Sequence, residues 1–434
     1  MDISHIKTYL NTHYNNIIVN VDSVVEEICK ISNIKNSNRN DNQIKADIYY
    51  IDKIVRKHFD DIVIFQEHQR KLNNLLKMKL PEQRSPEWYE MRRDKLTASS
   101  IATAMGEDHF NSKYKLIYDK LTNAPHVSNI HTEWGTKYEE IATRFYQLIT
   151  GTIVREFGMI PHPHFPIFGA SPDGICDDTG PQEYCSRMLE IKCPTRREFW
   201  KRGSKTKWMP HHYWMQMQGQ LEVCDLDECD FLQVKLEEYK DDKEYRKDIL
   251  NLDLPFKHSY PNIEGYDTTI NGKTKDNLPK GCVISYFKED EKTFSYLYPP
   301  LLQSYEEAMN WIDSHIKSGI NIQEIKWWKI VRYEVDLVKR DKDWWLNNIH
   351  KIINFYDNYV YYREHLDELE KKVMKTDKEV NINISLPAPD FALCGSSSDD
   401  EIAKKSNNIN TNTNTNTNTN TNTNTNTQIT DLIL

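Results

Sequence analysis

The chain has 434 residues, a formal net charge of −9 and 38% hydrophobic residues. This length allows one large or two modest domains. The acidic balance excludes a globally basic nucleic-acid binder, so any contact with DNA has to come from a local basic patch. The 8 cysteines include no C-x-x-C pair and signal neither a zinc site nor a disulfide framework. No apolar run approaches the length of a membrane span, which predicts a soluble, intracellular protein without a membrane partner.

The first 80 residues are predicted to be helical. Apolar residues recur there at helical spacing, among them Ile44, Ile48, Ile51 and Val55. The stretch 32–42 is rich in Asn and Ser, which indicates a loop between helices. We see no chemical motif in this region and interpret it as an accessory or partner-binding bundle.

A helix start is predicted at Ser85 and Pro86, with the serine as N-cap and the proline in the first turn. Arg92, Arg93 and the hydroxyl-bearing stretch around Ser99 follow. Free backbone N–H groups at the start of a helix bind anions, and a nearby arginine can hold a phosphate through two parallel hydrogen bonds. Taken alone, the stretch around Ser99 more often means simple N-capping.

Residues 134–150 are predicted to form an amphipathic helix whose apolar side chains, such as Ile141 and Phe145, share one face. Glu139 and Glu140 both lie off that face. Periodicity does not choose between them, and a solvated acidic pair is the alternative.

A strand is predicted at 153–160. It is followed by His162 and His164, which could suggest metal ligands. The prolines that alternate with them favour a surface loop instead.

Asp173, Glu190 and Lys192 are the candidate catalytic residues. Asp173 stands between a proline and a glycine, which predicts a strand that ends in a turn. Glu190 and Lys192 lie two positions apart, so that a strand would place both on one face. Carboxylates hold hard cations such as Mg²⁺, and a neighbouring lysine can hold or activate water. This composition suits metal-assisted hydrolysis of a phosphodiester, although the spacing alone is also compatible with a charged surface hairpin.

A basic segment follows directly, with eight Lys or Arg residues and two Glu between positions 187 and 208. The basic residues are Arg187, Lys192, Arg196, Arg197, Lys201, Arg202, Lys205 and Lys207. Trp200 and Trp208 are interleaved with them and offer stacking surfaces. A solvated charged face is the alternative, but the position after the candidate catalytic strand favours contact with DNA.

The rest of the chain alternates between helical and strand patterns. A helix is predicted at 213–222, where three glutamines occur at alternate positions, and a half-buried strand at 232–237. Residues 240–281 resemble an insertion, and 283–298 suggests a hairpin. A strand around Tyr333 and a helix from Trp345 complete the region.

Beyond about residue 380 the composition becomes polar, with Asn/Thr alternation over most of 408–427. Such a segment cannot build a core, and it predicts a disordered tail.

Four motifs occur in an order that resembles the lambda exonuclease and YqaJ-type viral recombinase family of PD-(D/E)xK nucleases. They are Arg-Ser-x-x-Trp-x-x-x-Arg with Thr-Ala-Ser from position 84, Trp-Gly-x-x-Tyr-Glu from 134, Ser-Pro-Asp-Gly with Leu-Glu-Ile-Lys-Cys-Pro from 171, and Gln-x-Gln from 216. The resemblance implies an α/β fold whose core is like that of restriction endonucleases, a mixed central sheet flanked by helices with the site at one sheet edge, preceded by the N-terminal helical region. Together with the periodicity and composition described above, it predicts three parts: 1–80, a nuclease domain over 81–375 with an insertion at about 240–281, and the tail 376–434.

The resemblance also implies roles for individual residues. Asp173, Glu190, the Ile191 carbonyl and Glu139 would hold Mg²⁺, for which Mn²⁺ can substitute. Lys192 would position or deprotonate water, and Gln218 would complete the site. Arg92 and Ser99 would bind a 5′-phosphate, while Arg196, Arg197, Lys201, Arg202, Lys205 and Lys207 would follow the DNA backbone. A further aspartate of the phage enzyme corresponds to Pro163 here, and the cysteines lack the grouping of the iron–sulfur branch.

The implied activity is that of a metal-dependent DNA exonuclease, 5′→3′ on duplex ends, in recombination, repair or DNA processing. Its implied partners are double-stranded DNA ends and, as a candidate, a single-strand-annealing protein, and a homo-oligomer is open. A viral origin would place it in host cytoplasm, nucleus or virion. Two alternatives remain: an endonuclease of the same fold, and a non-catalytic DNA-end-binding protein. The intact Asp173, Glu190 and Lys192 argue against the second.

Overall fold

The computed structural model describes most of the chain as far as residue 385. The described residues are 3–14, 20–34, 40–108, 111–124, 129–195, 199, 209–251, 253, 271–288 and 293–385. All belong to the first of two compact units, Met1–Ser396. Helix α12 (Leu366–Ser385) continues past position 376, where the sequence analysis begins the tail. The rest of the predicted tail lies outside the described residues.

Three helices form the N-terminal region: α1 (Ile3–His13), α2 (Val21–Ile31) and α3 (Asp41–Leu76). Their buried side chains make a separate hydrophobic cluster that includes Leu10 and Ile28. The prediction that this region is helical is confirmed.

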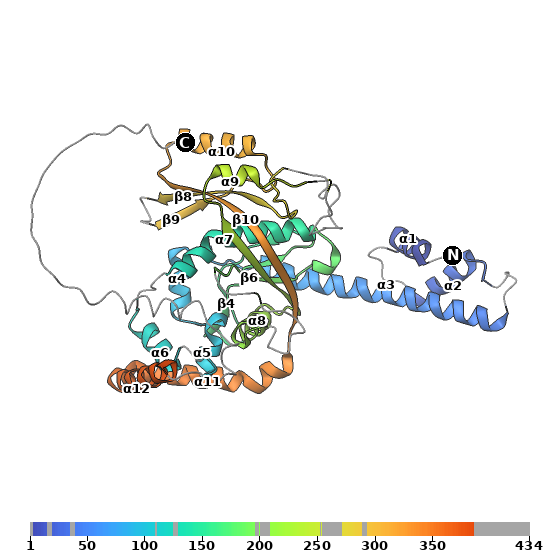
Figure 1. Ribbon diagram of the computed structural model, residues 1–434. Helices are drawn as coiled ribbons and strands as arrows, with labels where there is room; N and C mark the ends of the chain where they lie inside the picture. The colour runs from blue at the N-terminus through green and yellow to red at the C-terminus, as the bar shows by residue number, and fades with distance from the viewer. Residues whose placement is uncertain are drawn as a thin grey trace, which may run out of the picture. The chain divides into compact units, whose positions relative to one another are not determined.

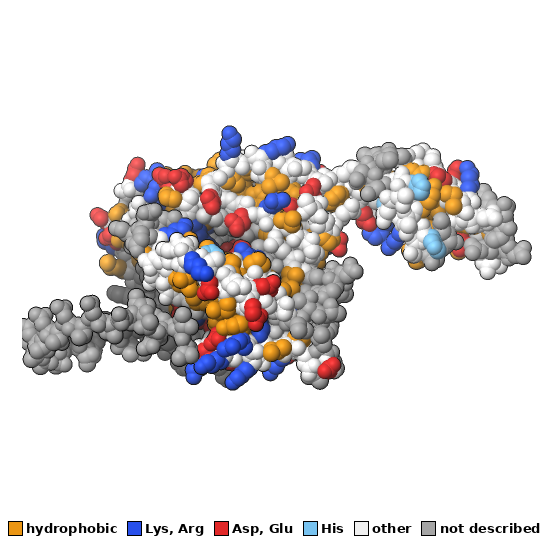
Figure 2. Space-filling view, turned by 90° about the horizontal axis from the view of Figure 1, so that it is seen from above, with side chains coloured by type: hydrophobic (Ala, Val, Ile, Leu, Met, Phe, Trp, Pro, Cys, Tyr) orange, Lys and Arg blue, Asp and Glu red, His pale blue; other side chains and the backbone are white. Residues whose placement is uncertain are grey.

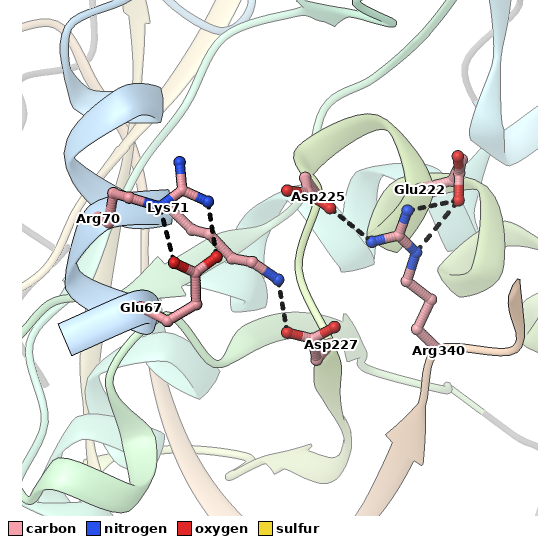
Figure 3. A network of polar contacts seen from close by, with 7 residues as sticks. All are labelled: Glu67, Arg70, Lys71, Glu222, Asp225, Asp227 and Arg340. Carbon is pink, nitrogen blue, oxygen red and sulfur yellow. Dashed lines mark hydrogen bonds and ion pairs between the residues drawn. The ribbon is translucent and has the colours of Figure 1, made fainter. Parts of the chain in front are cut away.

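The C-terminal end of α3 meets the rest of the unit. Leu72 and Leu75 of this helix belong to the main hydrophobic core, and Lys71 forms an ion pair with Asp227 at 2.6 Å. Figure 3 shows this pair beside a second one, in which Arg340 bonds Glu222. The same helix thus covers the N-terminal cluster with one half and packs on the main core with the other.

The main sheet has seven strands in the order β2-β5-β6-β7-β10-β8-β9. Its strands are β2 (Val154–Arg155), β5 (Gly174–Cys176), β6 (Met188–Lys192), β7 (Glu228–Glu238), β8 (Lys280–Lys288), β9 (Thr293–Leu297) and β10 (Ile322–Lys339). Strands β6 and β7 pair in parallel, and the other pairs are antiparallel. The sheet is therefore mixed, as predicted. Because β5 and β6 are interior strands, the candidate residues lie at strand ends and not on an outer strand.

Alternation along the central strands divides the core into two layers. In β6, Leu189 and Ile191 join the cluster that contains the apolar face of α7 (Ile130–Thr150). Met188 joins the cluster that contains α8 (His211–Cys224). Figure 1 shows α7 and α8 with the central strands between them. The α/β architecture with flanking helices is thus confirmed, and Glu190 and Lys192 fall on the side of Met188.

The remaining elements surround this core. The helices are α4 (Pro86–Arg93), η2 (Ala98–Ser100), α5 (Ile101–Met105), α6 (Lys113–Leu121), η3 (Gln182–Tyr184), α9 (Asp242–Lys247), α10 (Tyr305–Lys317) and α11 (Lys342–Glu364). A second sheet has the order β1-β4-β3, with β1 (Leu96–Thr97), β3 (Ile160–Pro161) and β4 (Phe168–Ala170). Gly219 lets α8 approach closely, because a Cβ there would lie 3.1 Å from Phe168 and 3.3 Å from Ile101.

Several predicted elements differ in detail. The strand predicted at 153–160 is two short strands, β2 and β3, that belong to different sheets. Strand β7, predicted to be half-buried, is buried along most of its length because helices cover both faces. The hairpin predicted at 283–298 is confirmed by the pairing of β8 with β9. Residues 254–270 of the predicted insertion lie outside the described residues.

Charges of both signs are distributed over the surface. Figure 2 shows Lys and Arg side chains interspersed with Asp and Glu over the face it presents. Among the described residues, no helix has the length and apolar character needed to cross a membrane.

Candidate active site

Asp173 is held in the connection from β4 to β5. The residue before it, Pro172, accepts a hydrogen bond through its carbonyl from Gln83 at 3.1 Å. The residue after it, Gly174, begins β5, and a Cβ at this position would lie 2.1 Å from Val154. The Ile191 N–H donates to Asp173 Oδ2 at 2.6 Å. The glycine is therefore required by the close approach of β2, and not by a turn, and the bond to Ile191 fixes the carboxylate beside β6.

Glu190 is fully buried on β6 and accepts hydrogen bonds from three side chains. Lys192 Nζ and Gln216 Nε2 donate to Oε1 at 2.5 and 2.8 Å. Gln220 Nε2 donates to Oε2 at 2.8 Å. The predicted convergence of Glu190 and Lys192 on one strand face is what the structure shows.

The structure does not bring Gln218 to this cluster. Its amide donates to the carbonyl of Lys339 at 3.0 Å and accepts from the N–H of Asp341 at 2.6 Å, so it joins α8 to the end of β10. The physical reason is helical geometry. Gln216 and Gln220 lie one turn apart on one face, whereas Gln218 is rotated by about 200° from Gln216. The spacing of four between the outer glutamines was the signal that the motif resemblance overlooked.

Glu139 and Glu140 of α7 have different surroundings. Glu139 accepts a hydrogen bond from Arg84 at 3.2 Å. Glu140 pairs with Arg144 of the same helix at 2.6 Å. Glu139 also interacts electrostatically with Glu190, which places it near the carboxylate cluster and supports the choice between the two glutamates.

The charges in this cluster shift one another's ionisation. Burial raises the pKa of Asp173 well above its ordinary value, and the nearby Glu190 and Glu139 raise it further. Burial likewise raises the pKa of Glu139. Burial alone would lower the pKa of Lys192, but Glu190 and Asp173 outweigh it and raise that pKa above its ordinary value. Three acidic side chains are thus crowded together, with Lys192 as the cation between them.

The donors in this cluster fit a hard divalent cation. Asp173, Glu190 and Glu139 supply carboxylate oxygens, Ile191 lies on the same strand end, and the mutual repulsion of the carboxylates would be relieved by a cation. Within the described residues no group of three or more His, Cys, Asp or Glu side chains is already arranged as a metal site. The carboxylates are instead bonded to Lys192, Arg84 and the Ile191 N–H.

Arg92 lies at the C-terminal end of α4 and is linked to the Asp173 connection through Trp88. The Arg92 guanidinium stacks on the Trp88 ring at 4.5 Å, and the indole donates to Ser171 Oγ at 3.0 Å. Burial lowers the pKa of Arg92. Arg93, in contrast, is exposed and pairs with Glu90 at 3.6 Å. This difference favours Arg92 over Arg93 as the phosphate-binding candidate.

Ser99 lies in η2 and its hydroxyl bonds that of Thr97 at 3.0 Å. Arg92 and Ser99 form no hydrogen bond to each other in the described part of the chain. The predicted cap of α4 is confirmed, because Ser85 Oγ accepts from the Trp88 N–H at 3.2 Å.

Lys120 of α6 is a neighbour of Arg92 that the sequence analysis did not single out. Its ammonium donates to the carbonyls of Arg92 and Arg93 at 3.3 Å and of Lys95 at 2.7 Å. Burial, followed by the charge of Arg92, lowers its pKa to about 8. Lys120 therefore fixes the end of the helix that carries Arg92. No sequence motif marks it.

Two other predicted features have simple outcomes. His162 is buried, and its Nδ1 accepts from the N–H groups of His164 and Phe165 at 3.1 Å, so it supports the loop as expected and is not placed as a ligand.

The predicted backbone-binding residues Arg196, Arg197, Lys201, Arg202, Lys205 and Lys207 lie outside the described residues.

The sequence of this chain is similar to a known family model and to two viral proteins. Residues 87–227 match the model of the YqaJ-like viral recombinase domain. The uncharacterized protein R354 of Acanthamoeba polyphaga mimivirus is 33% identical over 359 residues, which are 76% of this chain and 62% of that protein. A protein of African swine fever virus is 28% identical over 118 residues, 26% of this chain and 33% of that protein. The chain thus spans less than two thirds of either relative.

Among solved structures, the alkaline exonuclease LHK-Exo from Laribacter hongkongensis is similar, with 21% identity, 67% of this chain and 100% of that chain covered, and a TM-score of 0.36. A phage-related exonuclease from Haemophilus somnus 129PT has 15% identity, 63% and 96% coverage, and a TM-score of 0.31. These scores are too low to carry an argument, and the assignment depends on the family model and its agreement with the motifs. The resemblance found in the motifs is confirmed: the chain matches the YqaJ-like viral recombinase domain over residues 87–227.

Proposed function

We propose that this chain is a metal-dependent DNA exonuclease that hydrolyses phosphodiester bonds from duplex ends with 5′→3′ polarity, in DNA recombination, repair or processing. The observation that carries the proposal is the convergence of Asp173, Glu190 and Lys192 at the ends of β5 and β6. All three residues lie within the segment that matches the YqaJ-like viral recombinase domain. Buried carboxylates beside a lysine are the composition that metal-assisted hydrolysis of a phosphodiester requires.

Each residue of the cluster has a distinct role in this proposal. Asp173, Glu190, Glu139 and the Ile191 carbonyl would hold Mg²⁺ or Mn²⁺. The bound ion would polarise the phosphate and lower the pKa of the attacking water. In the site without a cation, the acidic neighbours of Lys192 raise its pKa and its ammonium donates to Glu190. Beside the bound ion, Lys192 would position or deprotonate the attacking water.

Glutamines support this arrangement from α8. Gln216 and Gln220 donate to different oxygens of Glu190, so they fix the rotation of its carboxylate. A metal ligand whose orientation is set by such hydrogen bonds needs little rearrangement when the ion binds. We therefore assign to Gln216 and Gln220 the role that the sequence analysis gave to Gln218.

The 5′ polarity is supported by the position of Arg92. Its side chain is held by Trp88, which is bonded to Ser171, two residues before Asp173. A guanidinium linked in this way to the connection that carries Asp173 can bind a terminal phosphate through a charge-assisted hydrogen bond. Ser99 and the basic residues between 196 and 207 remain the predicted further contacts with DNA.

The proposal is tested with linear duplexes labelled at the 5′ or the 3′ end and with a covalently closed circle. With Mg²⁺, the 5′ label should be released first as a mononucleotide, while the circle stays intact and EDTA stops the reaction. Cleavage of the circle would show an endonuclease of the same fold. Binding of ends without any product, with Mg²⁺ or Mn²⁺, would show a non-catalytic end-binding protein.

A further inference from the structure

The segment 83–88 contacts the candidate active site at three points. Gln83 donates to the carbonyl of Pro172, and Trp88 donates to Ser171 Oγ. Between these two anchors, Arg84 extends to Glu139. Arg84 therefore lies against the same carboxylate cluster whose chemistry is proposed above, but neither the motifs nor the comparisons give it a role.

The backbone of Arg84 has an uncommon conformation. Its φ is 66°, in the left-handed region that a side chain with a Cβ rarely adopts. Asn, Asp and Ser account for five of the seven non-glycine residues with positive φ in the described chain, and Arg84 and Leu302 are the bulky exceptions. Glycine would adopt this conformation at lower cost. An arginine at this position is therefore best explained by what its side chain does.

The Arg84 side chain has hydrogen-bonding capacity to spare. A guanidinium has five N–H donors, and within the described part of the chain Arg84 makes one hydrogen bond, to Glu139 at 3.2 Å. The side chain is 47% exposed, compared with 33% for Glu139. Because Arg84 is nearly half exposed, its pair with the partly buried Glu139 contributes little free energy, so the contact can be exchanged for another of similar strength.

We propose that Arg84 is a substrate-binding residue, which holds Glu139 while the site has no cation and turns to a non-bridging oxygen of a DNA phosphate once a divalent cation takes Glu139. The inference rests on the function proposed above. Arg84 donates to Glu139 Oε2, and a cation that takes this oxygen would displace the guanidinium. Once released, the forked donors of Arg84 match the geometry of a phosphate at the cluster.

The test compares Arg84→Gly and Arg84→Lys with the wild-type protein. Three quantities are measured: the melting temperature, the affinity for Mn²⁺ by calorimetry without DNA, and the affinity for a duplex end with Ca²⁺ in place of Mg²⁺. Asn33→Gly is the matched control, because it makes the same backbone change at φ 51° in the N-terminal region.

For Arg84→Gly we expect an unchanged or higher melting temperature, because glycine relieves the backbone strain. Mn²⁺ should bind as well as in the wild type or a few-fold tighter, while DNA affinity should fall about tenfold, the effect of one charge-assisted contact. Arg84→Lys keeps the charge without the fork and should recover part of the DNA affinity. Asn33→Gly should change neither affinity.

Several results would overturn the inference. Unchanged DNA affinity in both Arg84 variants would remove its substrate role, even if the wild type proves to be a nuclease. Weaker Mn²⁺ binding in Arg84→Gly would show that Arg84 supports Glu139 in the metal-bound site and does not compete there. If Arg84→Gly melts lower than the wild type, the strain argument is wrong. The DNA affinity of Arg84→Lys then tests the substrate role, and an affinity equal to that of the wild type would contradict it. If the wild type binds Mn²⁺ and DNA but cleaves neither end, the proposed function is contradicted. The Mn²⁺ and DNA affinities of the Arg84 variants would still test whether Arg84 binds DNA.

Discussion

The two ends of α4 meet opposite electrostatic environments. Just before the helix, Arg84 faces the acidic cluster, where each carboxylate already has a hydrogen-bond donor such as Lys192 or the Ile191 N–H. At the other end, Arg92 is stacked on an indole and has Lys120 as a cationic neighbour. In the described chain Arg92 forms no ion pair.

The difference agrees with the ligand proposed for each end. Burial and then the crowded carboxylates raise the pKa of Asp173, so a cation would be favoured at this end. Burial, followed by the charge of Arg92, lowers the pKa of Lys120, so an anion would be favoured at the other end. The proposed substrate, a DNA end, would use both: the cation for hydrolysis of a phosphodiester, and the cationic end for a terminal phosphate.

Substitutions in the carboxylate cluster should have the largest effect on cleavage. Glu190→Gln or Lys192→Ala is expected to reduce cleavage by a factor of at least about 100, as the loss of one catalytic electrostatic contact does, while DNA is still bound. The measurement is the initial rate on a linear duplex together with the DNA dissociation constant. Glu183→Gln, an exposed glutamate outside the cluster, is the control. Full activity in either site variant would remove these residues from the catalytic mechanism.

Removal of Arg92 should alter end selection and leave the metal site intact. Arg92→Ala is expected to reduce the preference for 5′-phosphorylated over 5′-hydroxyl ends by roughly tenfold, since one charge-assisted contact contributes about 1.5–3 kcal/mol. Initial rates on both ends are compared for the wild type, Arg92→Ala and Arg93→Ala. Loss of the preference in the Arg93 variant alone would shift the assignment by one residue. An unchanged preference in both would place the phosphate site elsewhere.

Two glutamine variants of α8 distinguish a residue that positions Glu190 from one that stabilises the fold. Gln216→Ala removes a donor to Glu190 and should slow cleavage with little change in the free energy of unfolding. Gln218→Ala removes two part-buried hydrogen bonds, one to the Lys339 carbonyl and one from the Asp341 N–H, and should destabilise the fold by about 1–3 kcal/mol. Urea unfolding and cleavage rates distinguish the two. Loss of cleavage with full stability in Gln218→Ala would restore the assignment made from the motif.

The smallest effect is expected for Lys120 and depends on pH. Folding lowers its pKa from an ordinary 10.5 to about 8, so between these values the unfolded chain holds more protons and a rise in pH stabilises the folded state. Between pH 7 and 8.5 the wild type should therefore gain about 1 kcal/mol of unfolding free energy relative to Lys120→Met. Lys115→Met on the same helix is the control. An equal pH dependence in the wild type and Lys120→Met would show that burial does not perturb this lysine.

Much of the fold could be predicted from periodicity, because helices and strands with one buried face repeat their apolar residues. Helix α7 and the hairpin of β8 and β9 were predicted in this way. The short strands β2 and β3 could not be, since each has two residues and is defined by pairing with segments far away in the chain. The burial of β7 could not be predicted for the same reason, because it depends on helices distant in the chain that cover its second face.

Much of the candidate site could also be predicted, because its residues are close in sequence or carry a family motif. The pairing of Glu190 with Lys192 follows from strand alternation alone. The contacts of Lys120 and Arg84 could not be predicted, because they join elements that no local pattern connects. Gln218 was assigned from a motif in which only the helical face distinguishes one glutamine from another.

The central claim is that the acidic cluster holds a divalent cation, and calorimetric titration with Mn²⁺ tests it most directly. The wild type should bind Mn²⁺, and Asp173→Asn should lose this binding. Asp178→Asn, the same change at an exposed aspartate that bonds Gln69, should bind as the wild type does. Equal Mn²⁺ affinity in the wild type and in Asp173→Asn would contradict the account, because the ion would then lie outside this cluster.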